Sequence, residues 1–283
     1  MGVDVHGLQI LCWASRKSTK FGRVATIGRQ AMSAPVEELR KHVSLPLDYK
    51  YPPHCEDLLV RVFGAERVDS FDNSAFEGCT YATDFNKPIV APCQYGTVID
   101  FGCLEHIYNV AQAFRNVSQL CEDGGQILHC LPANNYCGHG FWQFSPELFF
   151  SLYSNQNGYS KTQVFIASLD DETTWYEVVA PRDGKRVPIL SDAPLYVICR
   201  TVKRGDFSHD NVQQSDYVFL WDKDAGDPAL QSSHMPRTGL GAVLQRNRFA
   251  RLLHRKLIVG LGLKGYSLKR NPSLIKRRIS DLI

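Results

Sequence analysis

Between residues 97 and 132 the chain alternates apolar runs with a segment of helical periodicity. Residues 97–100 form a short apolar run that ends in an acid, and from Glu105 onward apolar side chains recur at helical spacing. The sequence EDGG at 122–125 ends that period, and a second apolar run at 126–131 precedes a proline. A strand, a helix and a strand in this order predict a right-handed crossover between parallel neighbours. Because ligands of parallel sheets bind beyond the carboxyl ends of the strands, we expect the chemistry in the loops after these two runs.

The pattern upstream predicts more strands and helices of the same kind. Short apolar runs predict strands at residues 23–27, 67–71 and 79–83. Helices are expected after Ser33, which is placed to cap a turn with a proline and two acids, and at residues 55–63 before a glycine. Residues 1–20 show no strong period, so they are either a flexible lead or an added edge element. Strands that alternate with helices favour a mixed α/β fold with a mostly parallel sheet.

The pattern downstream predicts one more helix and an antiparallel edge. The sequence SPE at 145–147 is typical of a helix start, and Asn-Gly at 157–158 is typical of a helix end. Strands are expected at residues 163–167, 174–180 and 195–201, and we expect two of them to form an antiparallel edge of the sheet. The acids at 170–172 are interpreted as a solvated turn, and no metal site is predicted. Residues 206–233 are polar and predict a loop that contains an isolated apolar patch.

Five short motifs occur in the order in which a known family carries them. They are a D-x-S turn (Asp72 to Ser74), a D-x-N turn (Asp84 to Asn86), LEH (Leu104 to His106), GG (Gly124 and Gly125), and GHGF followed by SPE (Gly138 to Phe141 and Ser145 to Glu147). Through these motifs residues 22–199 resemble the class I S-adenosylmethionine-dependent methyltransferases, most closely their small bacterial-type members. The resemblance implies a Rossmann-like α/β fold, with a mostly parallel sheet, helices on both faces and an antiparallel edge. It also implies S-adenosyl-L-methionine as the cofactor and methyl transfer to a small polar acceptor, with a sugar or glycolipid hydroxyl as the leading candidate.

The resemblance places the cofactor against the loops that follow the first strands. Asp72 would accept both ribose hydroxyls, as acids at strand ends do in other Rossmann-like sites, and Asp69 is the near alternative. Asp84 would take the adenine amino group, and Phe85 would supply an apolar ring face. Each acid has the alternative role of closing a turn. The predicted cofactor-binding residues are Gly28, Arg29, Gln30, Asp72, Asp84, Phe85, Asn86, Phe101 and Gly102.

The acceptor side is expected in the loops after the fourth and fifth strands. His106 and His139 are the candidate bases, because imidazole titrates near neutrality, and Glu105 would orient His106 or contact the ammonium group of the cofactor. The alternative is that both histidines are satisfied structural residues. A polar and aromatic rim suited to a sugar is predicted from Asn134, Asn135, Phe141 and Gln143. Phe141, Trp142 and Phe144 have packing as their alternative role.

The first loop, TIGRQAM, keeps only Gly28 where family members carry several glycines. Arg29 and Gln30 add bulk at positions where the backbone approaches the cofactor, so two functions stay open. One is a methyltransferase in which these two side chains contact the cofactor carboxylate. The other is a methyltransferase-fold protein without catalysis, which serves as a scaffold docked through a basic tail.

Composition limits the cellular setting. The nine cysteines are an odd number and lack CxxC spacing, which favours reduced thiols. The apolar run at residues 7–14 follows Asp4 rather than Lys or Arg and is a poor signal peptide, and no apolar run approaches the roughly 20 residues that span a bilayer. We therefore expect a cytoplasmic protein, with peripheral membrane attachment as the alternative.

Charge divides the chain into an acidic body and a basic tail. From Gly241 onward eleven Lys and Arg residues stand against one acid, which leaves 21 basic and 28 acidic residues before it. Residues 248–257 carry arginines on one helical face and apolar residues on another, so a basic amphipathic helix is predicted. This helix is expected either to lie on an anionic membrane surface or to dock on the acidic body or a second subunit. Nucleic acid is the least favoured partner, because no motif that recognises bases accompanies the charge. The predicted division is 1–202 as a methyltransferase-like domain and 203–283 as a linker and basic extension.

Overall fold

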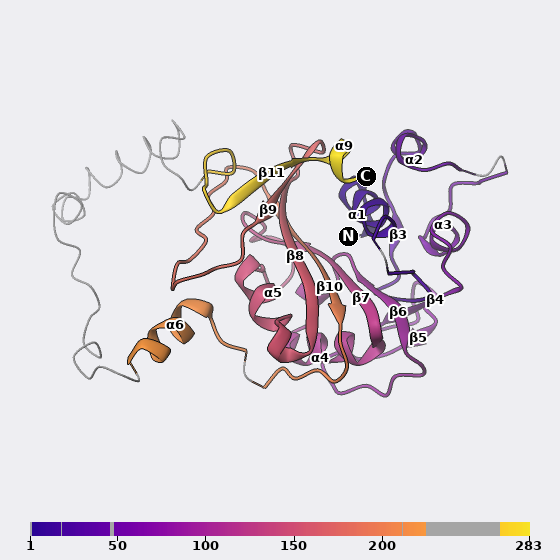
Figure 1. The fold of residues 1–283 in the computed structure, drawn as a ribbon. Helices are drawn as coiled ribbons and strands as arrows, with labels where there is room; N and C mark the ends of the chain where they lie inside the picture. Colours follow the sequence, from indigo (N-terminus) through magenta and orange to yellow (C-terminus); the bar gives the residue numbers. More distant parts are fainter. Residues whose placement is uncertain (1, 18, 46–47, 211, 225–266) are drawn as a thin grey trace.

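The structure, a computed structural model, describes residues 2–17, 19–45, 48–210, 212–224 and 267–283 (Figure 1). Within these residues the main feature is a nine-stranded sheet in the order β11-β9-β8-β10-β7-β6-β2-β4-β5. Its strands are β2 (Arg23–Ile27), β4 (Arg67–Asp72), β5 (Tyr81–Ala82), β6 (Tyr95–Asp100), β7 (Cys121–Pro132), β8 (Tyr159–Ser168), β9 (Thr174–Val178), β10 (Leu195–Lys203) and β11 (Leu274–Arg278).

One half of the sheet is parallel and the other half is antiparallel. Strands β5, β4, β2, β6 and β7 pair in parallel, whereas β10 runs antiparallel between β7 and β8, and β9 and β11 continue the antiparallel half. The chain moves outward from β2 to β4 on one side and starts again at β6 on the other. Strand order therefore reverses between β2 and β6, the point at which open α/β sheets bind ligands. The predicted Rossmann-like α/β class is confirmed.

Helices cover both faces of the sheet, as expected. They are α1 (Val5–Ser15), α2 (Val36–His42), α3 (Glu56–Arg61), α4 (Val110–Leu120), α5 (Pro146–Leu152), α6 (Ser215–Asp224) and α9 (Ile279–Leu282), with 3₁₀ turns η1 (Leu104–His106) and η2 (Asn155–Asn157). Successive strand residues alternate between the two cores: Val98 packs with α4 and α5, and Ile99 packs with α1, α2 and α3. This alternation is the two-residue period of a strand that is buried on both faces.

The N-terminal segment is a buried helix and not a flexible lead. Strand β1 (Gly2–Val3) pairs with β3 (Ala31–Met32), and Asp4 then caps α1 by accepting a hydrogen bond from the Gly7 N–H at 2.8 Å. Trp13 is completely buried and packs edge-on against Phe165. The sequence pattern missed this helix because it is apolar on all sides, so it has no polar face to reveal a period.

Several boundaries differ from the pattern for local reasons. The helix expected from Glu105 begins only at Val110, because residues 104–106 form the separate turn η1. Ser33 does not cap α2, because Pro35 occupies the N-cap position of that helix. The EDGG segment lies inside β7 rather than in a turn, and β5 is shorter than the predicted strand. The predicted start of α5 is confirmed, since the Ser145 hydroxyl accepts from the Glu147 N–H at 3.2 Å.

The C-terminal part rejoins the main sheet. Strand β11 pairs with β9 at the outer edge, and Ile279 of α9 is buried in the same core as α1, which lies beside α9 in Figure 1. All three strands expected near the edge are antiparallel, not two of them, and the apolar patch at 217–221 belongs to α6. The predicted boundary at residue 202 thus does not separate β11 from the sheet. The basic helix predicted at 248–257 lies outside the described residues. None of the helices in the described ranges has the length and apolar character to cross a bilayer.

Candidate functional site

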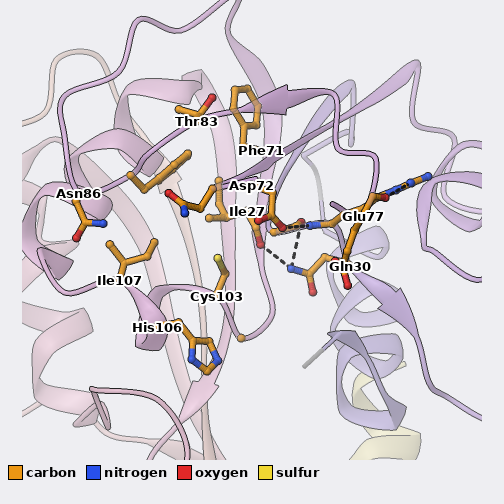
Figure 2. Close-up of a pocket in the computed structure, with 15 residues that line it drawn as sticks. Ile27, Gln30, Phe71, Asp72, Glu77, Thr83, Asn86, Cys103, His106 and Ile107 are labelled. Atoms are coloured by element: carbon orange, nitrogen blue, oxygen red, sulfur yellow. Dashed lines mark hydrogen bonds between the residues drawn. The ribbon is translucent and has the colours of Figure 1, made fainter. Parts of the chain in front are cut away.

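A cavity of about 420 Å³ opens at the carboxyl ends of β2, β4 and β6, where the strand order reverses (Figure 2). Most of the residues predicted to bind a cofactor line it, and these are Gly28, Arg29, Gln30, Asp72, Phe85, Asn86 and Gly102. Apolar contacts come from Ile27, Phe71 and Ile107, and His106 forms part of the wall. The cavity therefore combines an acid at a strand end with an apolar surface, and one titratable histidine borders it.

The glycine-poor loop after β2 folds without filling this cavity. Gly28 has a φ of +74°, a conformation that favours glycine, and its N–H donates to the Phe71 carbonyl at 2.6 Å. The Arg29 guanidinium turns to Glu56, with Nε 2.8 Å from Oε1, and also donates to the carbonyl of Glu77. Gln30 is buried and donates to the Ile27 carbonyl at 2.6 Å. The two bulky side chains thus bind protein groups, and space for a ligand remains.

The structure separates the two candidate acids of β4. Asp72 lines the cavity, and its carboxylate accepts from the Arg29 N–H at 3.3 Å. Asp69 is buried elsewhere, where it accepts from the Tyr95 hydroxyl at 3.0 Å and from Arg67 Nε at 2.8 Å. Asp69 is therefore fully engaged away from the cavity, and the geometry favours Asp72 as the acid that faces a ligand.

Two predicted cofactor residues do not line the cavity. The Asp84 carboxylate accepts from the backbone and side-chain N–H groups of Asn86 at 3.0 and 2.9 Å and pairs with Lys87 at 3.1 Å. These hydrogen bonds, with those of Asn86 first, lower the pKa of Asp84. Asp84 thus holds Asn86, which does line the cavity. Phe101 is buried in the core on the α1 side of the sheet, so its predicted contact with a cofactor has no geometric support.

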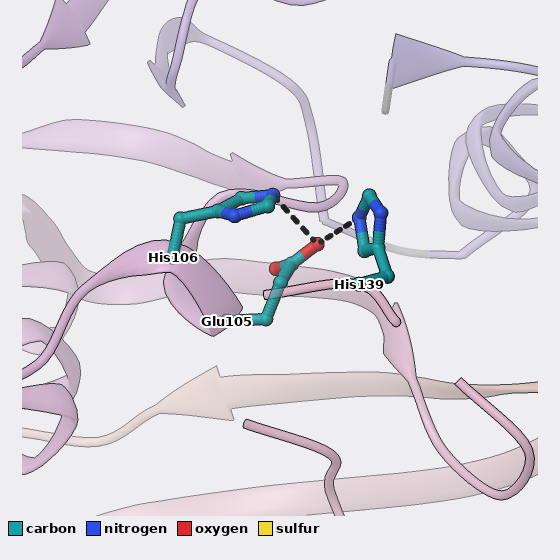
Figure 3. Close-up of side chains that lie close together, drawn as sticks. All are labelled: Glu105, His106 and His139. Carbon is teal, nitrogen blue, oxygen red and sulfur yellow. Dashed lines mark ion pairs between the residues drawn. The ribbon is translucent and has the colours of Figure 1, made fainter. Parts of the chain in front are cut away.

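The three residues predicted to be catalytic meet beside the cavity (Figure 3). Glu105 Oε1 lies 3.4 Å from His139 Nε2 and 3.7 Å from His106 Nε2, and Glu105 is completely buried. Among the described residues neither carboxylate oxygen of Glu105 has a hydrogen-bond donor. Burial, and then the charge of Asp100, raises the pKa of Glu105 to about 8. Burial is also the main cause that lowers the pKa of both histidines, so each imidazole carries a free lone pair at neutral pH.

Backbone hydrogen bonds dock the His139 loop onto η1. The carbonyl oxygen of Glu105 accepts from the N–H groups of Phe141 at 2.7 Å and Trp142 at 3.2 Å. The Trp142 indole N–H donates to the Ile107 carbonyl at 2.9 Å. Gly140 has a φ of +70°, and a Cβ atom there would lie 2.8 Å from the Glu105 carbonyl oxygen. Only glycine lets the loop approach closely enough to place His139 on Glu105.

Asp100 anchors the turn η1 through hydrogen bonds from its backbone. Its Oδ1 accepts from the N–H groups of Cys103 at 3.1 Å and Leu104 at 3.3 Å, and its Oδ2 lies 2.8 Å from His129 Nδ1. His129 Nε2 in turn lies 2.7 Å from the Tyr153 hydroxyl. Sequence analysis identified the acid at the end of 97–100 but missed His129. A histidine inside a strand that is otherwise apolar was the available signal.

The predicted acceptor rim is only partly exposed to a ligand. The side-chain amides of Asn134 and Asn135 donate to the carbonyls of Ile189 and Ser191 at 2.9 and 2.7 Å, so they hold the loop before β10. Gln143 Oε1 accepts from the Cys137 thiol at 3.8 Å. Phe141, by contrast, is 68% exposed.

A second aromatic residue joins the exposed part of the rim. Tyr108 is 76% exposed and meets Phe141 edge-to-face at 6.3 Å. The packing alternative therefore fits buried Phe144 but not Phe141. Tyr108 was not predicted from the sequence, because an aromatic residue just beyond the LEH motif carries no signal of its exposure.

Comparisons with known proteins find solved structures that resemble this chain remotely. No protein-family model and no curated protein matches the sequence. The N-methyltransferase NodS from Bradyrhizobium japonicum WM9, solved with S-adenosyl-L-homocysteine, is 12% identical, with 70% of this chain and 85% of that one covered and a TM-score of 0.40. An O-methyltransferase of a trans-AT PKS multienzyme from Brevibacillus brevis, solved with the same ligand, is 10% identical; the match covers 70% of this chain and 71% of that one, with a TM-score of 0.41. The YcgJ protein from Bacillus subtilis is 11% identical; the match covers 70% of this chain and 98% of that one, with a TM-score of 0.38.

These values are too low to transfer an activity to this chain. Identities between 10% and 12% and TM-scores near 0.4 leave the functional conclusion to the geometry of the chain's own residues.

Proposed function

We propose that this chain is an S-adenosylmethionine-dependent methyltransferase that acts on the hydroxyl group of a small polar acceptor such as a sugar or glycolipid. One observation carries the proposal: His106 belongs both to the wall of the cavity at the strand reversal and to the Glu105 cluster, which consists of buried Glu105 with His106 and His139. A cofactor bound in that cavity and an acceptor held at the cluster would meet at this residue. The remote similarities to methyltransferases agree with the proposal but do not carry it.

The cavity suits the cofactor in size and in the chemistry of its walls. A volume of about 420 Å³ falls within the range of small-molecule sites, roughly 300–1,000 Å³. Asp72 is the acceptor for the two ribose hydroxyls, and the rings of Phe71 and Phe85 provide an apolar surface for adenine. Asn86 is fixed by Asp84 and by the Asn109 N–H, which donates to its Oδ1 at 3.0 Å, so its second amide N–H is the group left for the polar edge of the base.

The Glu105 cluster suits the transfer step. Methyl transfer is an in-line displacement: the acceptor oxygen bonds the methyl carbon, and the carbon–sulfur bond breaks with its electron pair left on sulfur. A hydroxyl acceptor also has to lose its proton, and the free lone pairs of His106 and His139 lie where that proton would be released. Positioning supplies a large part of the acceleration in such reactions. Tyr108 and Phe141 present an aromatic edge on which a sugar face can pack.

Calorimetric titration with S-adenosylmethionine and S-adenosylhomocysteine tests the cofactor assignment. We expect micromolar binding, about −8 kcal/mol. The Asp72→Asn variant should bind about 10- to 100-fold more weakly, since it loses a charged hydrogen-bond acceptor. Asp84→Asn should have a smaller effect, because that residue acts through Asn86.

A matched control variant accompanies the test of cofactor binding. Asp171→Asn changes an acid in the turn before β9, where it accepts from Thr173, and should leave cofactor affinity unchanged. Folded protein that gives no heat with either ligand would favour the non-catalytic scaffold instead.

If cofactor binds, formation of S-adenosylhomocysteine with free sugars, glycolipids and non-sugar alcohols compares acceptor classes. Equal rates across these classes would exclude a sugar-specific site.

A further inference from the structure

We propose that Glu105, His106 and His139 bind one divalent transition-metal ion, with Zn²⁺ as the best match to their donor atoms, beside the proposed cofactor cavity. One carboxylate and two imidazoles converge there, and their donor atoms all lie within 4.8 Å of one another. Figure 3 shows the two rings pointing at the same Glu105 oxygen from opposite sides.

The two distances from Glu105 to the histidine nitrogens match ligands of one ion better than hydrogen bonds. Tetrahedral Zn²⁺ has bonds of about 2.0–2.1 Å to nitrogen and oxygen, which places neighbouring ligand atoms about 3.3–3.4 Å apart. Glu105 Oε1 lies 3.4 Å from His139 Nε2 and 3.7 Å from His106 Nε2. Both values exceed the usual range of nitrogen–oxygen hydrogen bonds, about 2.7–3.2 Å. The donor nitrogens of His106 and His139 lie within 4.8 Å of each other, so an inward movement of the half-exposed His106 ring would complete a three-ligand site.

The donor types select the class of metal. Two histidines and one glutamate form a ligand set found in catalytic zinc sites, which leave a fourth position open. Imidazole nitrogens favour zinc, copper, nickel and iron over magnesium and calcium, which prefer oxygen ligands. In the described part of the chain no Lys or Arg forms an ion pair with Glu105, and the only paired groups are the two histidines.

A second observation points independently to a bound cation. The Glu105 side chain is completely buried, and neither of its oxygens has a hydrogen-bond donor among the described residues. Burying a carboxyl group with both oxygens unpaired is costly, and a divalent ion would supply the missing partner and keep the group ionised. The surroundings also hold the ligands in place, since the Glu105 carbonyl anchors the His139 loop and Asp100 anchors η1.

An ion at this place would act on the acceptor, and this step rests on the proposed function. The nitrogen lone pairs of His106 and His139 would then bind the ion, so the ion would replace the two histidines in removing the proton of the acceptor. The acceptor oxygen would occupy the open position, and its proton would leave to solvent water as the oxygen–metal bond forms. A bound cation favours that loss by stabilising the alkoxide. The oxygen would then attack the methyl carbon, and the products would be the methyl ether and S-adenosylhomocysteine.

Metal binding is measured without any methyl transfer. Protein stripped with a chelator is titrated with ZnCl₂ and, separately, with MgCl₂ in a calorimeter. We expect one Zn²⁺ per chain, with Mg²⁺ bound far more weakly. Co²⁺ then reports the ligands by its visible absorption, and a near-ultraviolet thiolate band would reveal that cysteines hold the ion instead.

Substitutions assign the ion to the three residues. His139→Ala, His106→Ala and Glu105→Gln should each weaken Zn²⁺ binding by at least about 100-fold, since even residues that merely orient ligands contribute 10- to 100-fold. The two histidines are partly exposed, so their variants should fold, which thermal unfolding checks.

His42→Ala is the matched control. Its Nε2 lies 3.7 Å from Glu38 Oε2, but no third donor within the described part of the chain completes that pair, so Zn²⁺ binding should be unchanged. Stoichiometric Zn²⁺ that survives all three substitutions, a thiolate band with Co²⁺, or no Zn²⁺ binding by folded protein would overturn the proposal. Cofactor binding without Zn²⁺ binding would refute the metal site alone, whereas the reverse result would refute the proposed function alone.

Discussion

The carboxylate of Asp100, the last residue of β6, lies 2.8 Å from the Nδ1 atom of His129 inside the neighbouring parallel strand β7, and both side chains are completely buried. An ionised carboxylate only accepts hydrogen bonds, so Nδ1 carries the proton and Nε2 accepts from the Tyr153 hydroxyl. The other oxygen of Asp100 receives the two N–H groups that shape η1. One buried acid thus links β7, the residue that follows α5 and the turn that presents Glu105.

Asp100→Asn is expected to destabilise the fold and the cluster together. The amide can accept on one side only, so either η1 or His129 faces an N–H group in place of an acceptor. We expect a loss of about 2–3 kcal/mol in the free energy of unfolding by urea. Tyr153→Phe removes only the last partner of the chain and should cost less, about 1–2 kcal/mol. Equal losses in the two variants would show that the charge of Asp100 is not the main contribution.

Gly140→Ala is expected to displace the His139 loop. The new methyl group would lie 2.8 Å from the Glu105 carbonyl, and alanine disfavours a φ of +70°. Strain and steric overlap together should cost about 2–4 kcal/mol in urea unfolding. Gly138→Ala is the matched control, because a Cβ at that position meets no atom within 4 Å. That variant should stay within about 0.5 kcal/mol of the parent chain, and a similar loss in both variants would refute the steric explanation.

His209 predicts a loss of stability as the pH falls. Burial, followed by the charge of Arg115, lowers its pKa from 6.5 to about 4. Its Nε2 lies 3.1 Å from the Tyr159 hydroxyl and 3.3 Å from the Ser118 hydroxyl. Between pH 6.5 and 4 the unfolded chain binds a proton that the folded chain does not, so the free energy of unfolding decreases through this window.

The variant His209→Gln isolates this contribution. Glutamine does not titrate, so the decrease in unfolding free energy between pH 7 and 4.5 should be shallower than in the parent chain. Urea unfolding at several pH values measures the slope. Parallel pH profiles for the two proteins would mean that His209 titrates normally in the folded state.

Ile279 tests whether the C-terminal strand belongs to the folded domain. It is 4% exposed and packs in the core shared with α1, and its N–H donates to the Thr173 carbonyl at 2.9 Å. Ile279→Ala should lower the free energy of unfolding by about 2–4 kcal/mol. Ile275 in β11 is 42% exposed, so Ile275→Ala should change it by about 0.5 kcal/mol or less. A negligible effect at both positions would show that the segment is not docked.

The parallel half of the sheet could be predicted because its signals are local. The run at 23–27 is β2 without any change of boundary, and an acid ends both β4 and β6. Period and turn residues report such strands directly, since their burial on both faces requires continuous apolar runs. The buried helix α1 and the edge strand β11 could not be predicted in this way. The first has no polar face, and the second is mostly exposed and basic.

The sequence by itself determined which side chains stand at the ends of the strands, because strand ends follow from local periodicity. Asp72 could be named as an acid at a strand end, and Glu105, His106 and His139 as residues of the loops after the fourth and fifth strands, with the resemblance to methyltransferases pointing to these positions. Only the tertiary structure decided their roles. It turned Asp69 into the core and Asp72 toward the cavity, and it brought His139 onto Glu105 through hydrogen bonds to a single carbonyl. Such contacts join segments far apart in the chain, so they depend on sheet register and loop docking, which no local pattern of residues encodes.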